Sequence, residues 1–307
     1  MNIVRFVEEF PDEKSCKIHL KLAREKDLLK CKRCNCTKHW WLETKWMWQC
    51  SSCNFRTSLR SGTIMESSKL SIRKWYLAMA FMTYSKKGIS AKELQRQLSH
   101  KYYEPIWLMM HKLRKSMGQR DSIYSLEGML EFDEAYFETE IDFKKKKNLK
   151  RGKGSERQKN VAIIAESTPL EDLNTGKKSS HVRFYKMTVL AGHKAEDVDE
   201  NLKESIEDKA IVFSDKSTSY VNISDYVEVH VTEKSSTETT NTTLKWVHIA
   251  ISNAKRTLLG IYHKIKGEYL QSYLDEFCYK LNRRYFGENL FDRLVIANIN
   301  GNWQSNR

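Results

Sequence analysis

The second half of the sequence predicts an α/β domain built around a mixed sheet, and the first half predicts a cysteine-rich unit followed by helices. Strand-like runs occur at 160–165, 182–190, 210–213 and 226–231, with a helical stretch at 194–206 among them. The first strands follow one another closely, as in hairpins, and a helical crossover then leads to another strand. This order is typical of a mixed sheet with helices.

Length and charge limit the class of protein. The 307 residues are enough for a sizeable core and for two or three units. Lysine and arginine number 53 against 39 aspartates and glutamates, which gives a formal net charge of +14. This surplus favours a polyanionic partner, most simply nucleic acid, over the alternative of a generally basic soluble protein.

We expect no membrane segment. The N-terminus (MNIVRFVEEF) contains early acidic residues and lacks the pattern of a signal peptide. The longest continuous apolar run, 75–82, is far too short to cross a bilayer. A cytoplasmic location is therefore expected, and there seven cysteines indicate metal ligands or free thiols rather than disulfides.

Four of the cysteines have the spacing of a zinc site. They form two C-x2-C pairs separated by fifteen residues: Cys31 with Cys34, and Cys50 with Cys53. Two tight turns each present a pair of thiolates, and the hairpin between them brings the pairs together around a tetrahedral ion. Zinc then supplies folding energy that so small a unit lacks. The sequence predicts a zinc ribbon over residues 1–66.

The other cysteines, Cys16, Cys36 and Cys278, are interpreted as buried or free thiols, although Cys36 or His39 is an alternative for one zinc ligand. The hairpin is rich in aromatic residues, namely Trp40, Trp41, Trp46, Trp48 and Phe55. A hydrophobic cover over the zinc site is favoured for them over stacking on bases.

Residues 67–120 predict a helical region. An apolar stripe spans 71–84, and Ser90 with Glu93 forms a capping box that opens a helix at 91–98. After a polar turn, a third helix at 106–117 carries His111, Lys112, Arg114 and Lys115. A short helix, a short turn and a basic helix resemble a helix-turn-helix that places the basic helix in the major groove. The alternative is a plain helical bundle with a solvated basic face.

An acidic strand at 130–137 opens the last region. Period-two alternation places Glu131 and Asp133 on one face, and Leu130, Phe132 and Glu134 on the other. A buried carboxylate without a partner costs several kcal/mol, so Asp133 needs one. The partner is either a basic side chain or a metal ion shared with other acids.

Two further features follow that strand. The segment 144–159 contains nine lysines or arginines, and it is interpreted as a solvated basic loop that is able to hold phosphates beside a nuclease-like site. Asp215 ends the apolar strand at 210–213. Acids at strand ends are where α/β sheets place their chemistry, and the alternative for Asp215 is a helix cap or a turn.

Two amphipathic helices complete the region. In the first, 243–263, His248 and Lys255 are seven residues apart and share a face, whereas Asn253 lies off that face. The second, 269–284, ends in the motif NRR at 282–284. These last residues either cap the helix and complement its dipole or contact DNA.

The order of these motifs resembles a group of bacterial insertion-sequence transposases. The cysteine pairs, the residues 58–66 (SLRSGTIME) and the segment 70–75 resemble the group's N-terminal zinc-ribbon module. Several short motifs of the second half resemble the group's catalytic domain, which is a DDE domain of the ISXO type. They are EFDE at 131–134, SD at 214–215, WVH at 246–248, SNAKR at 252–256, GIYH at 260–263, YLDEF at 273–277 and NRR at 282–284. The resemblance covers nearly the whole chain.

The resemblance implies an RNase H-like fold, a mixed sheet with flanking helices, over residues 121–307. It is preceded by the zinc ribbon and by the helix-turn-helix-like DNA-binding region at 67–120. The resemblance also implies two catalytic divalent ions, normally Mg²⁺ with Mn²⁺ as an alternative, held by acids from separate elements.

The resemblance assigns Asp133 to the first acidic position and Asp215 to the second. The third acid of the commonest pattern stands seven residues before a lysine, and that lysine is Lys255, which places His248 at the third position. A neutral imidazole is able to ligate a metal. Asn253 is the alternative at this position, and Glu131, Glu134 or Glu238 are further sources of negative charge.

The implied function is that of a transposase. Such an enzyme binds the terminal inverted repeats of its element, cleaves DNA strands and joins the ends to target DNA, and it acts as a homo-oligomer on double-stranded DNA. The protein is then nucleoid-associated when bound. The alternatives are a non-catalytic zinc-containing DNA-binding regulator derived from a transposase, and a metal-dependent nuclease with another purpose.

Overall fold

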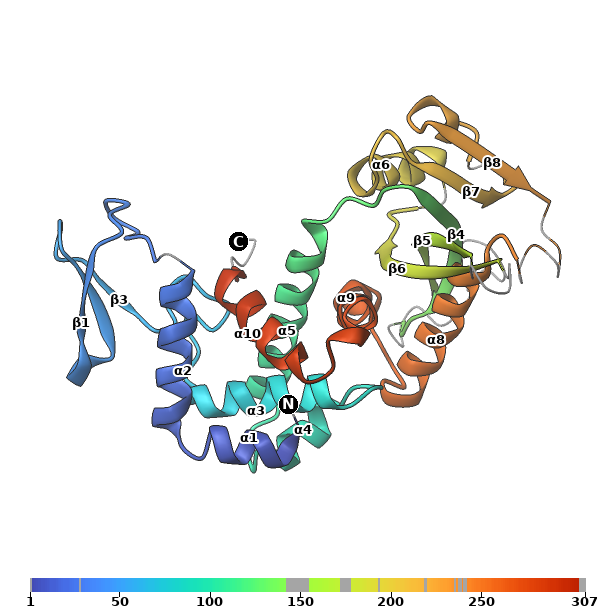
Figure 1. Ribbon diagram of the computed structural model, residues 1–307. Helices are drawn as coiled ribbons and strands as arrows, with labels where there is room; N and C mark the ends of the chain where they lie inside the picture. The colour runs from blue at the N-terminus through green and yellow to red at the C-terminus, as the bar shows by residue number, and fades with distance from the viewer. Residues whose placement is uncertain are drawn as a thin grey trace. The chain divides into compact units, whose positions relative to one another are not determined.

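The computed structural model describes residues 2–27, 29–141, 155–171, 178–192, 194–217, 220–234, 236, 239 and 242–303. Most of the predicted basic loop and Glu238 lie outside these residues. The chain divides into two compact units, of which the first contains residues 1–120 and 284–307 and the second contains residues 121–283 (Figure 1). Within the described residues, no helix combines the length and the apolar character needed to cross a membrane.

The first unit begins with two helices that the zinc-ribbon prediction did not include, α1 (Ile3–Glu9) and α2 (Glu13–Lys26). A capping box opens α2, because Asp12 accepts from the N–H of Ser15 while the Ser15 hydroxyl faces the N–H of Asp12. Asp12 followed three residues later by Ser15 is therefore the local signal for this helix.

A small antiparallel sheet follows, made of β1 (His39–Leu42), β2 (Met47–Cys50) and β3 (Arg56–Ser58). Cation–π contacts join the sheet to α2, since each of three tryptophans lies under a cation of that helix. The pairs are Lys17 with Trp46 at 5.2 Å, Lys21 with Trp41 at 5.1 Å and Arg24 with Trp48 at 5.1 Å. Trp40 is the exception, because 68% of its surface is exposed.

The three predicted helices of the next region are present as α3 (Ile72–Tyr84), α4 (Ala91–Gln97) and α5 (Glu104–Ser122). Ser90 caps α4 as predicted, accepting from the N–H of Glu93 at 3.1 Å. The basic residues of α5 differ from the expectation, because His111, Lys112 and Arg114 are all buried.

The burial of these residues has a physical cause in the packing of α5. Lys112 donates to the carbonyl of Glu66 at 2.9 Å, and its ammonium lies 5.5 Å from the ring centre of Trp303. His111 packs against Trp107, with the ring centres 4.1 Å apart and the ring planes tilted by 45°. These side chains therefore stabilise the helical unit and do not form the solvated or groove-reading face expected from the sequence.

The first unit is completed from the other end of the chain, by η6 (Arg284–Asn289) and α10 (Leu290–Asn300). Helix α10 packs against α3 and α2, and Phe291 joins an aromatic cluster with Phe6, Phe10 and Tyr76 at centroid separations of 5.6–5.9 Å. The predicted catalytic region was given as 121–307, whereas the residues after Arg283 belong to the first unit because of this packing.

The second unit contains a mixed five-stranded sheet in the order β6-β5-β4-β7-β8. Strands β4 (Met129–Glu138), β5 (Gln158–Glu171) and β6 (Lys178–Val189) are antiparallel, whereas β7 (Ile211–Asp215) and β8 (Val229–Glu233) run parallel to β4. The crossover between β6 and β7 contains α6 (Ala195–Ser205). The mixed α/β sheet predicted from the strand spacing is therefore confirmed.

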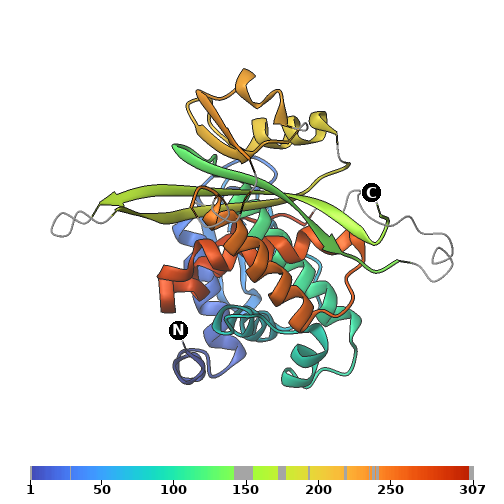
Figure 2. The same ribbon diagram turned by 90° about the vertical axis from the view of Figure 1, so that its right-hand side faces the viewer.

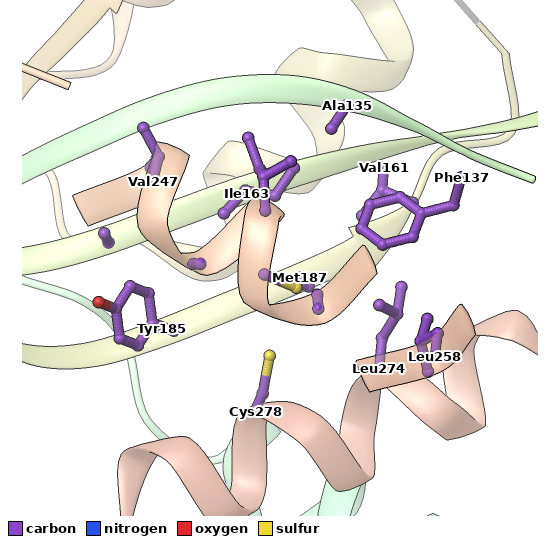
Figure 3. Close-up of a cluster of buried hydrophobic side chains, with 14 of the residues drawn as sticks. Ala135, Phe137, Val161, Ile163, Tyr185, Met187, Val247, Leu258, Leu274 and Cys278 are labelled. Carbon is purple, nitrogen blue, oxygen red and sulfur yellow. The ribbon is translucent and has the colours of Figure 1, made fainter. Parts of the chain in front are cut away.

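Helices cover both faces of this sheet. Helix α6 and the short η4 (Ile223–Asp225) pack on one face, over a core that includes Phe132 and Val212. On the other face lie α8 (Lys245–Ile261) and α9 (Leu270–Asn282), which η5 (Gly267–Tyr269) precedes (Figure 2). Figure 3 shows the core between these two helices and the strands.

Two amide side chains of α9 satisfy the outer edge of β6. Asn282 accepts from the N–H of Tyr185 at 2.8 Å and donates to its carbonyl at 3.0 Å. Gln271 accepts from the N–H of Val189 at 2.8 Å and donates to the carbonyl of Met187 at 3.0 Å. Backbone groups of an edge strand that would otherwise need another chain are thus paired within the unit.

Candidate active site and zinc-binding cluster

Asp133 lies on the face of β4 that α8 covers. The side chains of β4 alternate as predicted: Phe132 belongs to the core under α6, whereas Ala135 and Phe137 belong to the core under α8. Glu131 and Asp133 share the parity of Ala135, so both acids point toward α8. Only 16% of the Asp133 side chain is exposed.

Asp215 ends β7, the parallel neighbour of β4. Phe132 is level with Ser214 in the register of the two strands, so Asp215 lies one step further along, beside Asp133. Phe213 has the same parity as Asp215, and it packs against the core under α8. The two predicted acids therefore lie side by side on one face, where the pairing of their strands ends.

The electrostatics of Asp133 reflect this arrangement. Burial is the main cause that raises the pKa of Asp133 to about 7, and the charges of Asp215 and Glu134 add to the shift. The N–H of Glu134, which donates to Asp133 Oδ1 at 2.8 Å, and the Lys255 ammonium act in the opposite direction. Two neighbouring carboxylates thus disfavour each other's charge, and a cation between them removes that cost.

His248 lies in the first turn of α8, with its Nε2 3.8 Å from Asp133 Oδ2. Burial lowers the pKa of His248, while the charge of Asp215 opposes this shift. The imidazole is therefore neutral around pH 7, and its ring keeps a lone pair for a ligand. The alternative residue, Asn253, is rotated by about 140° around the helix from His248 and accepts a hydrogen bond from Arg256 at 3.1 Å.

Lys255 is two turns further along α8 on the face of His248. Its ammonium lies 5.6 Å from the ring centre of Phe137, a neighbour of Asp133 on the same face of β4. Its charge is one of the influences that lower the pKa of Asp133. The structure thus brings Asp133, Asp215, His248 and Lys255 to one face of the sheet, whereas Asn253 points elsewhere.

The other acids of β4 have distinct contacts. Glu134, on the opposite face, accepts from the Asn160 amide at 2.5 Å and from the Tyr220 hydroxyl at 3.2 Å. Glu131 is 5% exposed and accepts from the N–H groups of Trp246 and Val247 at 2.7 and 3.0 Å. Burial raises the pKa of Glu131 to about 7, against the effect of these two hydrogen bonds.

The sequence did not reveal the contact of Glu131 with α8, because the partners are 115 and 116 residues away. One local signal was available. Residue Leu244 stands at the N-cap position of α8, and a leucine has no oxygen with which to cap a helix.

In the first unit, the four predicted zinc ligands form one cluster. The sulfur atoms of Cys31 and Cys53 are 3.6 Å apart, those of Cys34 and Cys50 are 3.5 Å apart, and all four lie within 4.8 Å of one another. A tetrahedral site with zinc–sulfur bonds of about 2.3 Å places sulfurs about 3.8 Å apart. The cysteine cluster therefore fits a zinc ribbon.

The thiols of this cluster influence one another. The backbone N–H of Cys53 is the main cause that lowers the pKa of Cys50 to about 6, whereas bonds to the neighbouring thiols raise the pKa of Cys34. The proposed substitutes are not part of this cluster: Cys36 lies 3.7 Å from the Lys38 carbonyl, and His39 Nδ1 is 3.0 Å from the carbonyl of Thr37. Over the described part of the chain, the four cysteines are the one group of His, Cys, Asp or Glu side chains with this close spacing.

The chain was compared with known families and proteins. A model described as the ISXO2-like transposase domain matches residues 125–282, which is just over half of the chain. This chain belongs to the ISXO2-like transposase family. The family match spans the sheet of the second unit and all four residues gathered around Asp133, and that sheet is the RNase H-like mixed sheet implied by the sequence resemblance.

Among solved structures, the chain is similar to the Mos1 mariner paired-end complex with Mn. The sequence identity is 12%, the match covers 75% of this chain and 80% of that one, and the TM-score is 0.29. No curated protein matches the chain.

Proposed function

We propose that the protein binds the terminal inverted repeats of an insertion sequence and catalyses metal-dependent DNA cleavage and strand transfer. One observation carries this proposal. In a member of a transposase family, Asp133, Asp215 and His248 converge on one sheet face from three separate elements. This convergence supports a metal-dependent phosphoryl transfer at this face of the sheet.

The donor set fits divalent ions. Two carboxylates suit Mg²⁺ or Mn²⁺, a neutral imidazole is a further metal ligand, and the repulsion between Asp133 and Asp215 supports a cation shared by the two acids. Asp133, Asp215 and His248 are the proposed ligands. Bound ions supply Lewis-acid stabilisation of the scissile phosphate and lower the pKa of water.

The remaining groups orient the DNA. Lys255 is exposed on the face of α8 that carries His248, so its ammonium is free to contact a phosphate near the acids. Glu134 holds Asn160 and Tyr220 on the opposite face, and we assign it a structural role. The protein's own contribution is thus to place two acids, one imidazole and one ammonium around the reacting phosphate.

The first unit offers a DNA-contact surface on the outer face of the zinc ribbon. Register places Trp40, Gln49 and Arg56 in one row across the three strands, and Arg56 donates to Gln49 at 3.3 Å. Trp48 and Thr57, on the other face, are buried. Residues 29–58 contain six lysines or arginines and one glutamate, so this surface suits a phosphate backbone.

The test uses purified full-length protein with Mg²⁺ and DNA that carries the terminal repeats of its own element. We expect nicking at the ends and joining to target DNA, with both activities lost in Asp133→Ala and Asp215→Ala. Asp208→Ala, which removes an exposed acid of the same unit, is the matched control and should retain activity. Absence of both reactions with correct ends would contradict the proposal, and light scattering of the DNA complex checks the expected homo-oligomer.

A regulator without catalysis is the second candidate. The observation that favours it is His248 itself, which stands where the commonest pattern has an acid and lies within ion-pair range of Asp133. A protonated His248 would pair with Asp133 in place of a metal. Tight binding to the ends, together with unchanged behaviour of Asp133→Asn in every assay, would favour this candidate.

A further inference from the structure

Helix α8 carries two proposed site residues but lacks a cap of its own. The first N–H groups of any α-helix have no partner within the helix. At the N-cap of α8, Leu244 offers no side-chain oxygen, and the first turn contains no acidic residue. The start of this helix is therefore not fixed by its local sequence.

Glu131 supplies the missing cap from the sheet. A single oxygen, Oε2, accepts from the N–H groups of Trp246 and Val247 at 2.7 and 3.0 Å. The side chain is almost fully buried, so these bonds are screened from water. One carboxylate thus joins the middle of β4 to the first turn of α8.

This contact lies close to proposed site residues on both the strand β4 and the helix α8. Glu131 is two residues before Asp133 on the same face of β4, and the N–H donors immediately precede His248 on α8. Because a strand and a helical turn are each stiff over two residues, the distance between His248 and Asp133 depends on this junction. That separation is 3.8 Å between Nε2 and Oδ2.

We propose that Glu131 is a positioning residue that fixes the first turn of α8 so that His248 faces Asp133, an inference that rests on the proposed function. Glu131 acts because its side chain is long enough to accept from two backbone N–H groups, and not because its charge attracts the metal or repels DNA. Side-chain length and charge can be changed separately by substitution, and the test uses this.

Three variants separate the two effects. Glu131→Gln removes the charge but keeps an oxygen at the same distance from the backbone. Glu131→Asp keeps the charge but withdraws it by about 1.5 Å, one carbon–carbon bond, which breaks contacts of this length. Glu131→Leu removes both. Asp199→Leu is the matched control, because Asp199 is a buried acid of α6 that accepts from Asn222 and Tyr226.

The first readout is amide hydrogen exchange in the second unit, measured on the full chain without added Mg²⁺ or Mn²⁺. We expect the amides of Trp246 and Val247 to exchange at least about tenfold faster in Glu131→Asp and Glu131→Leu. Glu131→Gln should exchange within about threefold of the wild type, and Asp199→Leu should leave these two amides unchanged. This readout needs no metal and no DNA, so it is independent of the proposed reaction.

The second readout is the affinity of each full-length variant for Mn²⁺ alone. Substitution of a residue that orients a metal ligand typically weakens metal binding about 10- to 100-fold. We expect weakening of this size in Glu131→Asp and Glu131→Leu, near wild-type affinity in Glu131→Gln, and no more than about a twofold change in Asp199→Leu. Asp133→Asn should abolish the same binding.

The outcomes are distinguishable. Retention of Mn²⁺ binding by Glu131→Asp with loss in Glu131→Gln would show that charge matters and would overturn the inference. An equal effect of Asp199→Leu would show that Glu131 contributes only to the overall stability of the fold, and this result would also overturn the inference. If the exchange rates follow the expected ranking while Asp133→Asn leaves Mn²⁺ binding unchanged, the proposed metal site fails and the cap on α8 stands.

Discussion

Replacement of Asp133 by asparagine should make the metal-free protein more stable while it removes activity. Burial raises the pKa of Asp133 from 3.8 to about 7 in the folded protein. The folded state therefore keeps a proton that the unfolded state releases, and stability falls as the pH rises from about 4 to about 7. Asparagine has nearly the same shape and does not ionise, so it avoids this cost.

The magnitude follows from the size of the shift. About three pKa units at about 1.4 kcal/mol each give roughly 4 kcal/mol as the largest cost of the ionised side chain at pH 8. Relaxation around the charge lowers this figure, and we expect Asp133→Asn to gain about 1–4 kcal/mol in free energy of unfolding at pH 8. Near pH 4 the difference should shrink to about 0.6 kcal/mol, because Asp133 is then protonated in the folded protein while the pH is close to its unfolded-state pKa of 3.8.

Urea unfolding followed by circular dichroism measures this difference, in a buffer free of Mg²⁺ and without chelator so that any zinc is kept. Addition of Mg²⁺ should then stabilise the wild type, by about 2.7 kcal/mol at a hundredfold excess over Kd, and leave Asp133→Asn unchanged. Asp208→Asn, at an exposed position, should show neither effect. A lower stability of Asp133→Asn at pH 8, or an equal gain from Mg²⁺, would refute the reasoning.

Three further results are expected. Metal analysis should find about one zinc per chain, and Cys50→Ser should lose it together with the β1–β3 sheet; a folded wild type without metal would exclude the zinc site. Trp40→Ala should weaken DNA binding by about tenfold in fluorescence anisotropy, whereas Leu22→Ala, at an exposed apolar position on α2, should not; equal affinities would remove Trp40 from the interface. Asn282→Ala should lower the free energy of unfolding by about 3 kcal/mol, since it breaks bonds to both backbone groups of Tyr185 and to Asp121; a loss below about 1 kcal/mol would count against its role at the edge of β6.

The parts of the site that local periodicity determines were predictable. Alternation along β4 placed Glu131 with Asp133, and the helical repeat placed His248 with Lys255, because each depends only on the geometry of one element. The side-by-side position of Asp133 and Asp215 required the register of two strands about 80 residues apart in sequence. Resemblance to a family, and not the pattern of residues, supplied that relation.

The features that escaped prediction depend on tertiary partners. The charged residues of α5 suggested an exposed face. Lys112 is instead buried, and its contacts with the Glu66 carbonyl and the Trp303 ring offset the cost of burying its charge. The Asn282-Arg283 pair suggested a helix end or DNA contact. In the structure Asn282 pairs with an edge strand, and Arg283 forms a buried ion pair with Asp121 at 2.6 Å. No local pattern in the sequence encodes such partners.

The return of α10 to the first unit has a consequence for synthesis. The aromatic cluster of Phe6, Phe10 and Tyr76 is completed by Phe291, so the ribosome must translate past Phe291 before the first unit is able to close. Products that end before Phe291 would leave this apolar cluster open. Such fragments should be degraded instead of persisting as DNA-binding competitors of the intact protein.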